Sequence, residues 1–167
     1  MKHWILNLTA LLFFAGCGYQ PASHFAKSVM GESISTEVVV SMEDPQNTVI
    51  IKDAVDTAVI TKFRTALVPK NSAKTHLKIA IASVTFIPLR YDINGYVITY
   101  RTTVVLHIDR ITDAKITPYS SHGMYDFAIE PNAIITDQAR FEAIRQGAQK
   151  GIDAFVAQVA AQGANSH

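Results

Sequence analysis

Residues 91–109 read YDINGYVITYRTTVVLHID and carry the clearest structural signal in the chain. From Tyr96 to Ile108, apolar, aromatic or β-branched residues occupy every second position. This period of two is the pattern of a half-buried β-strand. Asn94-Gly95 precedes the run, and that dipeptide between two strand-like runs is the strongest short signal for a β-hairpin. The stretch therefore predicts a long strand that pairs with the residues before the turn.

One further strand is predicted on each side of this one. Residues 77–86 alternate in the same way, with a slip in phase that predicts a β-bulge near Ser83. Pro88 should end this strand or lie at a sheet edge, because proline lacks the N–H that a central strand donates. A turn at residues 112–114 leads to the more polar run 116–127, which we expect to be an edge strand.

The N-terminal half of the chain adds one strand and one helix. Residues 34–42 alternate with period two and predict a half-buried strand, and the turn-forming residues 43–47 end it. In residues 48–68 the apolar side chains recur three and four positions apart, so they share one face of a helix. Pro69 is expected to end that helix.

The C-terminal segment predicts a second, longer helix. Thr136 or Asp137 is expected to cap its N-terminus. Gly147 and Gly151 lower its intrinsic stability but would allow it to approach a sheet closely. Its predicted apolar stripe consists of Phe141, Ile144, Ala148, Ile152, Phe155, Val156 and Val159.

The predicted order is strand, helix, three strands, helix. Each helix has one apolar stripe and the sheet has one apolar face, so both helices should pack on that face. We predict an α+β two-layer sandwich with a four-stranded mixed sheet. Residues 33–162 are expected to form one domain, and residues 163–167 are expected to fray.

The chain begins with the features of an export signal. Lys2 precedes an apolar run over residues 4–14, which is too short to span a bilayer, and small residues lead to Cys17. The lipoprotein pathway acylates a cysteine at this place, and Cys17 is the only cysteine in the chain. We predict that residues 1–16 are a removed signal peptide. Residues 17–32 would then be a lipidated N-terminus and tether.

Composition argues against several classes of function. With 15 basic and 14 acidic residues, the chain lacks the basic excess of a nucleic-acid-binding protein. It has no glycine-rich phosphate loop and no Gly-x-Ser-x-Gly elbow, so we predict that it is not an enzyme. The six histidines show no helical ligand spacing. We expect neither a metal nor another cofactor, apart from the diacylglycerol and palmitate-type acyl chain on Cys17.

Aromatic and basic residues gather around the predicted hairpin turn. Tyr91, Tyr96 and Tyr100 flank it together with Arg90 and Arg101, and both residue types are enriched in contact surfaces. The simpler interpretation is that Tyr96 and Tyr100 pack within the strand and that the arginines face solvent. Arg101 is the better candidate for binding because it lies on the face opposite the apolar stripe.

The order of these features resembles a known family. A signal ending Gly16-Cys17-Gly18-Tyr19, followed by strand, helix, three-strand meander and long helix, is similar to the LptE lipoproteins of outer-membrane lipopolysaccharide assembly. The similarity is greatest to the branch found in Campylobacter-like bacteria. The stretches that carry the resemblance are EDP at 43–45, YDINGY at 91–96, YDFAIEPN at 125–132 and RFEAI at 140–144.

The resemblance implies a protein held by its lipid anchor at the periplasmic face of the outer membrane. It implies a domain seated in an LptD β-barrel, which supports that barrel and helps deliver lipopolysaccharide to the outer leaflet. Because lipid A phosphates are anionic, we expect contacts from basic residues. The candidates are Arg90, Arg101 and Lys78.

A second hypothesis comes from a different class of protein. The chain could be a free-standing, lipid-tethered periplasmic module that binds a small ligand or an envelope partner. This hypothesis requires a pocket lined by the tyrosines and arginines of the hairpin. An enzyme would require His107 or His122 within bonding reach of a carboxylate in a cleft.

Overall fold

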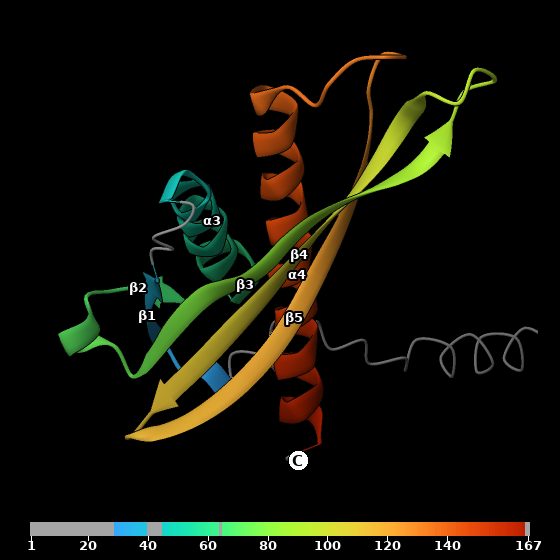
Figure 1. The fold of residues 1–167 in the computed structure, drawn as a ribbon. Coiled ribbons are helices and arrows are strands. Elements are labelled where there is room, and N and C mark those ends of the chain that lie inside the picture. Colours follow the sequence, from blue (N-terminus) through green and yellow to red (C-terminus); the bar gives the residue numbers. More distant parts are fainter. Residues whose placement is uncertain (1–28, 40–44, 64, 166–167) are drawn as a thin grey trace, which may run out of the picture.

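A five-stranded sheet with two helices on one of its faces makes up the fold (Figure 1). The computed structural model describes residues 29–39, 45–63 and 65–165. The strands lie in the order β2-β1-β3-β4-β5. The elements are β1 (Ser33–Val38), α3 (Pro45–Ala58), β2 (Ala66–Leu67), β3 (Thr75–Tyr91), β4 (Val97–Thr112), β5 (Lys115–Ala128) and α4 (Asp137–Ala164).

The mixed α+β arrangement is confirmed, but the sheet has five strands and not the predicted four. The extra strand is β2, which pairs in parallel with β1. The amide of Ala66 donates to the Glu32 carbonyl at 3.2 Å, and the amide of Val68 donates to the Ile34 carbonyl at 2.9 Å. These bonds pair the N-terminal part of the edge of β1 that faces away from β3.

The same residues explain why the first helix is shorter than predicted. α3 ends at Ala58, and a single π-helical turn (Val59–Phe63) follows it. The prediction that the helix continues through residue 68 was wrong, because short apolar runs fit helix and strand patterns alike. Residues 40–44, the end of the predicted first strand and the start of its turn, lie outside the described residues.

Strands β3, β4 and β5 form a long antiparallel meander. The register between β3 and β4 shifts between Ile81 and Ser83, which confirms the predicted bulge. β3 continues past Pro88 to Tyr91, so that proline does not end the strand. β1 pairs with β3 only as far as Ile79. Beyond that point β3 has a free edge in the described structure, and a free edge tolerates proline. β5 forms the opposite edge, as predicted.

The helix α4 packs tightly across the meander. The side chain of Thr136 accepts a hydrogen bond from the Ala139 amide at 3.2 Å, which confirms the predicted cap. A Cβ atom added to Gly123 of β5 would lie 2.1 Å from the Gly147 carbonyl oxygen and 2.3 Å from the Gly151 amide nitrogen. The expected close approach of the helix to the sheet is therefore present. It depends on glycine in the strand as well as in the helix.

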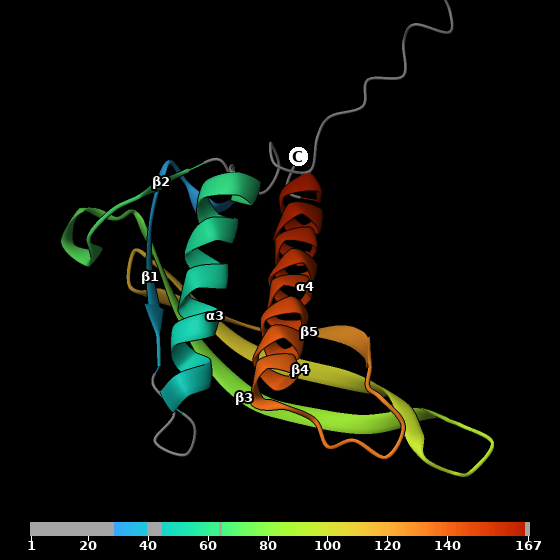
Figure 2. The same cartoon turned by 90° about the horizontal axis from the view of Figure 1, so that it is seen from above.

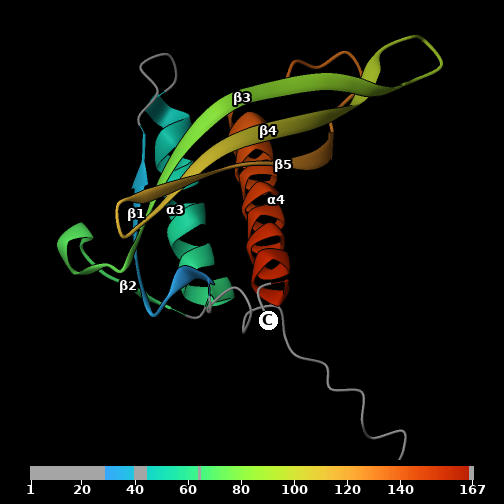
Figure 3. The same ribbon diagram turned by 90° about the horizontal axis from the view of Figure 1, so that it is seen from below.

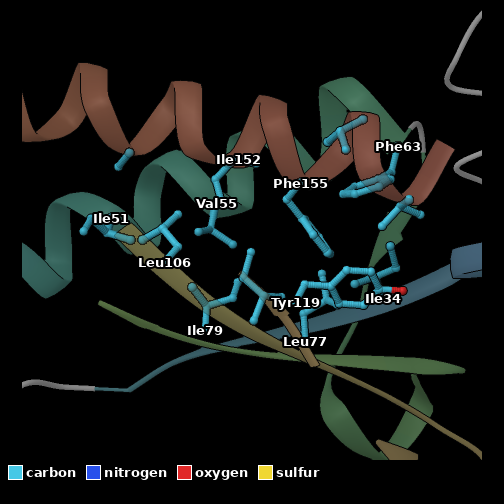
Figure 4. Packing of buried hydrophobic residues seen from close by; sticks show 14 of the residues in the cluster. Ile34, Ile51, Val55, Phe63, Leu77, Ile79, Leu106, Tyr119, Ile152 and Phe155 are labelled. Carbon is cyan, nitrogen blue, oxygen red and sulfur yellow. The ribbon is translucent and has the colours of Figure 1, made fainter. Parts of the chain in front are cut away.

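The core fills the space between the helices and the sheet (Figure 4). Phe155 of α4 makes edge-to-face contacts with Phe63 at 6.0 Å and with Tyr119 of β5 at 5.1 Å between ring centroids. Most of the predicted stripe of α4 is buried, but Phe141 is only half-buried. Met30, which lies within the predicted tether, is fully buried in this core.

Both helices lie on the same side of the sheet, as predicted (Figures 2 and 3). Along β4 the side chains of Thr102, Val104, Leu106 and Ile108 are buried toward the helices. Within the described residues no element covers the opposite face of β3, β4 and β5. The β3–β4 hairpin extends past the N-terminus of α4 (Figure 1).

Candidate functional site: the open sheet face

The uncovered side of the meander is the candidate site, and we call it the open sheet face. Because side chains alternate along a strand, the neighbours of the buried β4 residues point away from the helices. Their cross-strand partners on β3 and β5 share that face. Its members are Lys78, Ala80, Ser83, Thr85, Ile87 and Arg90 of β3; Thr99, Arg101, Thr103, Val105, His107 and Asp109 of β4; and Ser120, His122, Met124 and Asp126 of β5.

Arg101 lies on this face, as predicted, and makes a two-pronged ion pair with Asp126 of β5. Its Nε lies 2.7 Å from one carboxylate oxygen, and a terminal nitrogen lies 2.7 Å from the other. The hydrogen bond from Arg101 lowers the pKa of Asp126, and the same bond raises the pKa of Arg101. An anionic ligand would therefore have to compete with Asp126 for this guanidinium.

The other two predicted contact residues lie at different places along β3. Arg90 is paired in register with Thr99, and Arg101 is paired with Ile87, so these two arginines are neighbours across the strands. Lys78 is paired with Asp109 near the other end of the sheet. Twelve positions along a strand correspond to about 40 Å. The structure therefore brings Arg90 and Arg101 together, and it separates Lys78 from both.

A buried histidine that the sequence did not single out lies between β1 and β3. His76 is only 8% exposed. Its Nδ1 lies 2.8 Å from the Ser35 hydroxyl and its Nε2 lies 3.2 Å from a carboxylate oxygen of Glu37. The amine of Lys70 lies 3.2 Å from the same oxygen. Lys70, and then His76, lower the pKa of Glu37.

This serine–histidine–carboxylate group holds two strands together. Ser35 is only 3% exposed, so its hydroxyl is not open to a substrate, as an attacking nucleophile would need to be. Its residues come from the parallel pairing of β1 with β3, which places Ser35 opposite His76. Spacing in the sequence gives no signal for it, because the register of two distant strands is a tertiary property.

His107 and His122 lie exposed on the open sheet face. Neither has a hydrogen bond to a carboxylate in the described part of the chain. Residues 29–39, 45–63 and 65–165 contain no group of three histidine, cysteine or acidic side chains placed to hold a metal ion. An enzyme would require one of these histidines beside a carboxylate in a cleft, and the described structure places neither of them there.

A shallow concavity of about 580 Å³ lies beside the first turns of α4. It is lined by Gln138, Phe141, Glu142 and Arg145. The last two form an ion pair at 2.6 Å. The tyrosines and arginines of the hairpin are not among these lining residues, so this concavity is not the cleft that the small-ligand hypothesis required.

The LptE family model, described as lipopolysaccharide assembly, matches residues 36–159. The chain belongs to the LptE family. Two solved structures share its fold at low sequence identity. A lipoprotein candidate from Caulobacter crescentus is 8% identical, with a TM-score of 0.54, over 85% of this chain and 98% of that one. Lipoprotein B from Nitrosomonas europaea is 14% identical, with a TM-score of 0.50, over 81% of this chain and 88% of that one. No curated protein sequence matches the chain.

Family membership confirms the resemblance seen in the sequence and gives a coarse function. LptE proteins are cell-envelope lipoproteins whose role, lipopolysaccharide assembly, is not an enzymatic one. Members of this family act together with the LptD barrel and with lipopolysaccharide. Among the described residues, no helix is both long enough and apolar enough to cross a membrane.

Proposed function

We propose that this protein is a non-enzymatic outer-membrane lipoprotein that binds and supports an LptD-like β-barrel and assists lipopolysaccharide delivery to the outer leaflet. The observation that carries the proposal is the match of the LptE family to residues 36–159. The open sheet face adds a structural argument, because it is a broad surface that neither of the two described helices, α3 and α4, covers.

The anchor is the first part of the proposal. Residues 1–16 are removed, and Cys17 carries the diacylglycerol and acyl chain that hold the protein at the periplasmic face. These residues lie outside the described part of the chain. The first described residues lie at one end of the sheet. A guanidinium nitrogen of Arg110 lies 2.9 Å from the Val29 carbonyl oxygen, so the chain enters the domain at the end of the sheet that holds the β4–β5 turn.

The docking surface is the second part. The centre of the open sheet face carries Thr103, Val105 and Met124, and the nearby Arg101 is already paired with Asp126. The interior wall of a β-barrel is polar, so this centre can lie against it without burying an unpaired charge. On the same face, Arg90 and Arg101 are proposed to meet the phosphates of lipopolysaccharide, and Lys78 is a separate, more distant candidate.

Depletion of the protein tests the function as a whole. We expect less lipopolysaccharide at the cell surface, measured by its accessibility to an added antibody or modifying enzyme. Undisturbed surface display after depletion would contradict the proposal.

A matched pair of substitutions tests the docking surface. Thr103→Glu places a charge at the centre of the open sheet face, and we expect co-purification with the barrel from detergent extracts to fall about tenfold, because an unpaired charge would be buried. Ala157→Glu is the control, because Ala157 is exposed on α4, on the helical side. Equal recovery of the barrel with both variants would show that the open sheet face is not the contact.

A further inference from the structure

β5 forms one side of the sheet, and its outer edge is blocked along only part of its length (Figure 1). Backbone groups that point outward from an edge strand can pair with another chain, so native proteins usually block them. Near the start of β5, Pro118 has no N–H to donate. Two residues further on, the side-chain amide of Gln158 donates to the Ser120 carbonyl oxygen at 3.1 Å. The first half of this edge is therefore blocked.

The second half of the strand, residues 121–128, carries outward backbone groups that are not blocked, and we call it the open edge. The Ile129 amide, just beyond the strand, donates to the Ile98 carbonyl oxygen at 3.1 Å, so odd-numbered residues of β5 bond toward β4. The positions of Pro118 and Ser120 agree, because these even-numbered residues bond away from β4. By this alternation, the outward amides of the open edge are those of His122, Met124, Asp126 and Ala128. Within the part of the chain that the structure describes, none of these amides donates to a partner.

The open edge is long and regular enough to accept another strand. Its pairing with β4 runs without a register shift over all eight of its residues, and a typical strand has about five or six. The opposite edge of the sheet is less suitable. Where β1 does not cover it, β3 contains the bulge near Ser83 and Pro88, which has no N–H. A regular added strand therefore fits β5 better than β3.

A positive charge lies beside the open edge on the side of the helices. Lys150 of α4 is exposed, and its amine lies 5.6 Å from the centre of the Tyr125 ring. Among the described residues Lys150 forms no ion pair. On the other side of the sheet, Arg101 is already neutralised by Asp126. A strand that pairs here would therefore gain from an acidic side chain on the side of Lys150.

We propose that the open edge of β5 binds an extended segment of the barrel protein, which pairs through main-chain hydrogen bonds and places an acidic side chain beside Lys150. A closed barrel wall has no free strand edges, so the segment belongs to a loop of the partner. The inference rests on the proposed function and adds how the partner is held. It is compatible with the docking surface, because the Met124 side chain points out of the sheet whereas its amide lies in the plane of the sheet.

A proline substitution tests the main-chain pairing. Met124→Pro removes one outward amide, at a place where proline has the same orientation in the strand as Pro118. We expect recovery of the barrel from detergent extracts to fall about tenfold, because the missing N–H and the bulk of the ring both oppose an added strand. Urea unfolding followed by circular dichroism shows whether the variant keeps its fold.

Met124→Ala and Ser120→Pro are the matched controls. The first keeps the outward amide and removes the side chain. The second places proline in the same orientation, but in the half of the edge that is already blocked. We expect both to recover the barrel as the parent does. Full recovery with Met124→Pro would overturn the inference, and so would an equal loss with Met124→Ala, because the side chain alone would then make the contact.

Hydrogen–deuterium exchange tests the same pairing without a substitution. We expect the amides of His122, Met124 and Asp126 to exchange rapidly in the free protein and about tenfold or more slowly in the complex with the barrel. The amide of Ser120 should exchange equally fast in both. Unchanged exchange at the three amides in the complex would overturn the inference. Slow exchange in the free protein would also overturn it, because the edge would then already be occupied by a second copy or by the chain itself.

A charge reversal tests the acidic character of the segment. We expect Lys150→Glu to lower recovery of the barrel about fivefold, because like charges would then face each other. Lys115→Glu, at the exposed start of β5, is the control and should leave recovery unchanged. Equal recovery with both variants would contradict an acidic segment. If the parent recovers the barrel while Met124→Pro has no effect and exchange is unchanged, the proposed function stands and the strand pairing alone is rejected.

Discussion

The covered part of the meander and its projecting hairpin follow one strand pattern but differ in what lies against them. Where α4 crosses β4 and β5, Gly123 lets the helix backbone approach so closely that there is no space for a Cβ atom. At the hairpin tip, a Cβ added to Gly95 would meet nothing within 4 Å. The comparison shows that the covered part stabilises the fold, whereas the projecting part exposes apolar residues that the fold itself does not use.

The largest effect is expected from a substitution in the covered part. Gly123→Ala would place a Cβ atom 2.1 Å from the Gly147 carbonyl oxygen, and backbone atoms on both sides would have to move. We expect it to lower the free energy of unfolding by about 3 kcal/mol or more. Urea denaturation followed by circular dichroism measures this change.

The matched substitution in the projecting part is Gly95→Ala. Its new methyl group meets no atom, so the cost is confined to the positive φ of +82°. We expect a loss of about 1 kcal/mol. If the two variants proved equally unstable, the contrast between the covered and projecting parts would be wrong.

An intermediate effect is expected where β1 joins β3. His76→Ala removes the partner of the Ser35 hydroxyl, which is buried. We expect a loss of about 1–3 kcal/mol, because a buried hydroxyl is left without its hydrogen bond. His107→Ala, on the open sheet face, is the control and should change the stability by less than about 0.5 kcal/mol. A loss from His76→Ala no larger than that of the control would show that the histidine contributes little to this pairing.

The smallest effect is expected in how the free energy of unfolding depends on pH. The pKa of Glu37 is lowered by Lys70 and then by His76. A carboxyl group whose pKa is lower in the folded state stabilises the fold above its unfolded pKa, and this stabilisation is lost as the pH falls through the lowered value. We expect Glu37→Gln to flatten slightly the decline in stability below about pH 4.5. The effect should be small because Glu37 is half exposed.

Unfolding by urea at several pH values between 3 and 7 would measure this slope. Glu130→Gln, in an exposed loop after β5, is the matched control. An identical slope for the parent and the Glu37→Gln protein would contradict the role assigned to the Lys70–Glu37–His76 group.

Several local features could be predicted from the sequence because they depend on neighbours along the chain. The alternation around Val104 predicted the central strand, and the phase slip near Ser83 predicted the bulge. Thr136 predicted the start of α4. The tyrosines were a mixed case. Tyr100 packs against Phe127 with ring centroids 6.1 Å apart, as the simpler interpretation held, whereas Tyr96 lies exposed in the turn.

The candidate site was predicted less completely. The sequence placed Arg101 on the face away from the core, and the structure agrees. Its ion pair with Asp126 joins residues 25 positions apart, and the sequence pattern contains nothing that selects that partner. The binding roles of Arg90, Arg101 and Lys78, the lipid on Cys17 and the bounds of the domain stay predictions.

The sequence by itself determined where the chain extends or coils, where it turns and which family it resembles, because periodicity, turn residues and caps act within a few residues. Only the tertiary structure decided that Ala66 and Leu67 join the sheet, that His76 lies between Ser35 and Glu37, and that no described element covers one face of the meander or the end of its hairpin. These outcomes depend on the register and packing of segments that are distant in the chain. The free energy that selects them comes from burial and pairing between those segments, which no local pattern records.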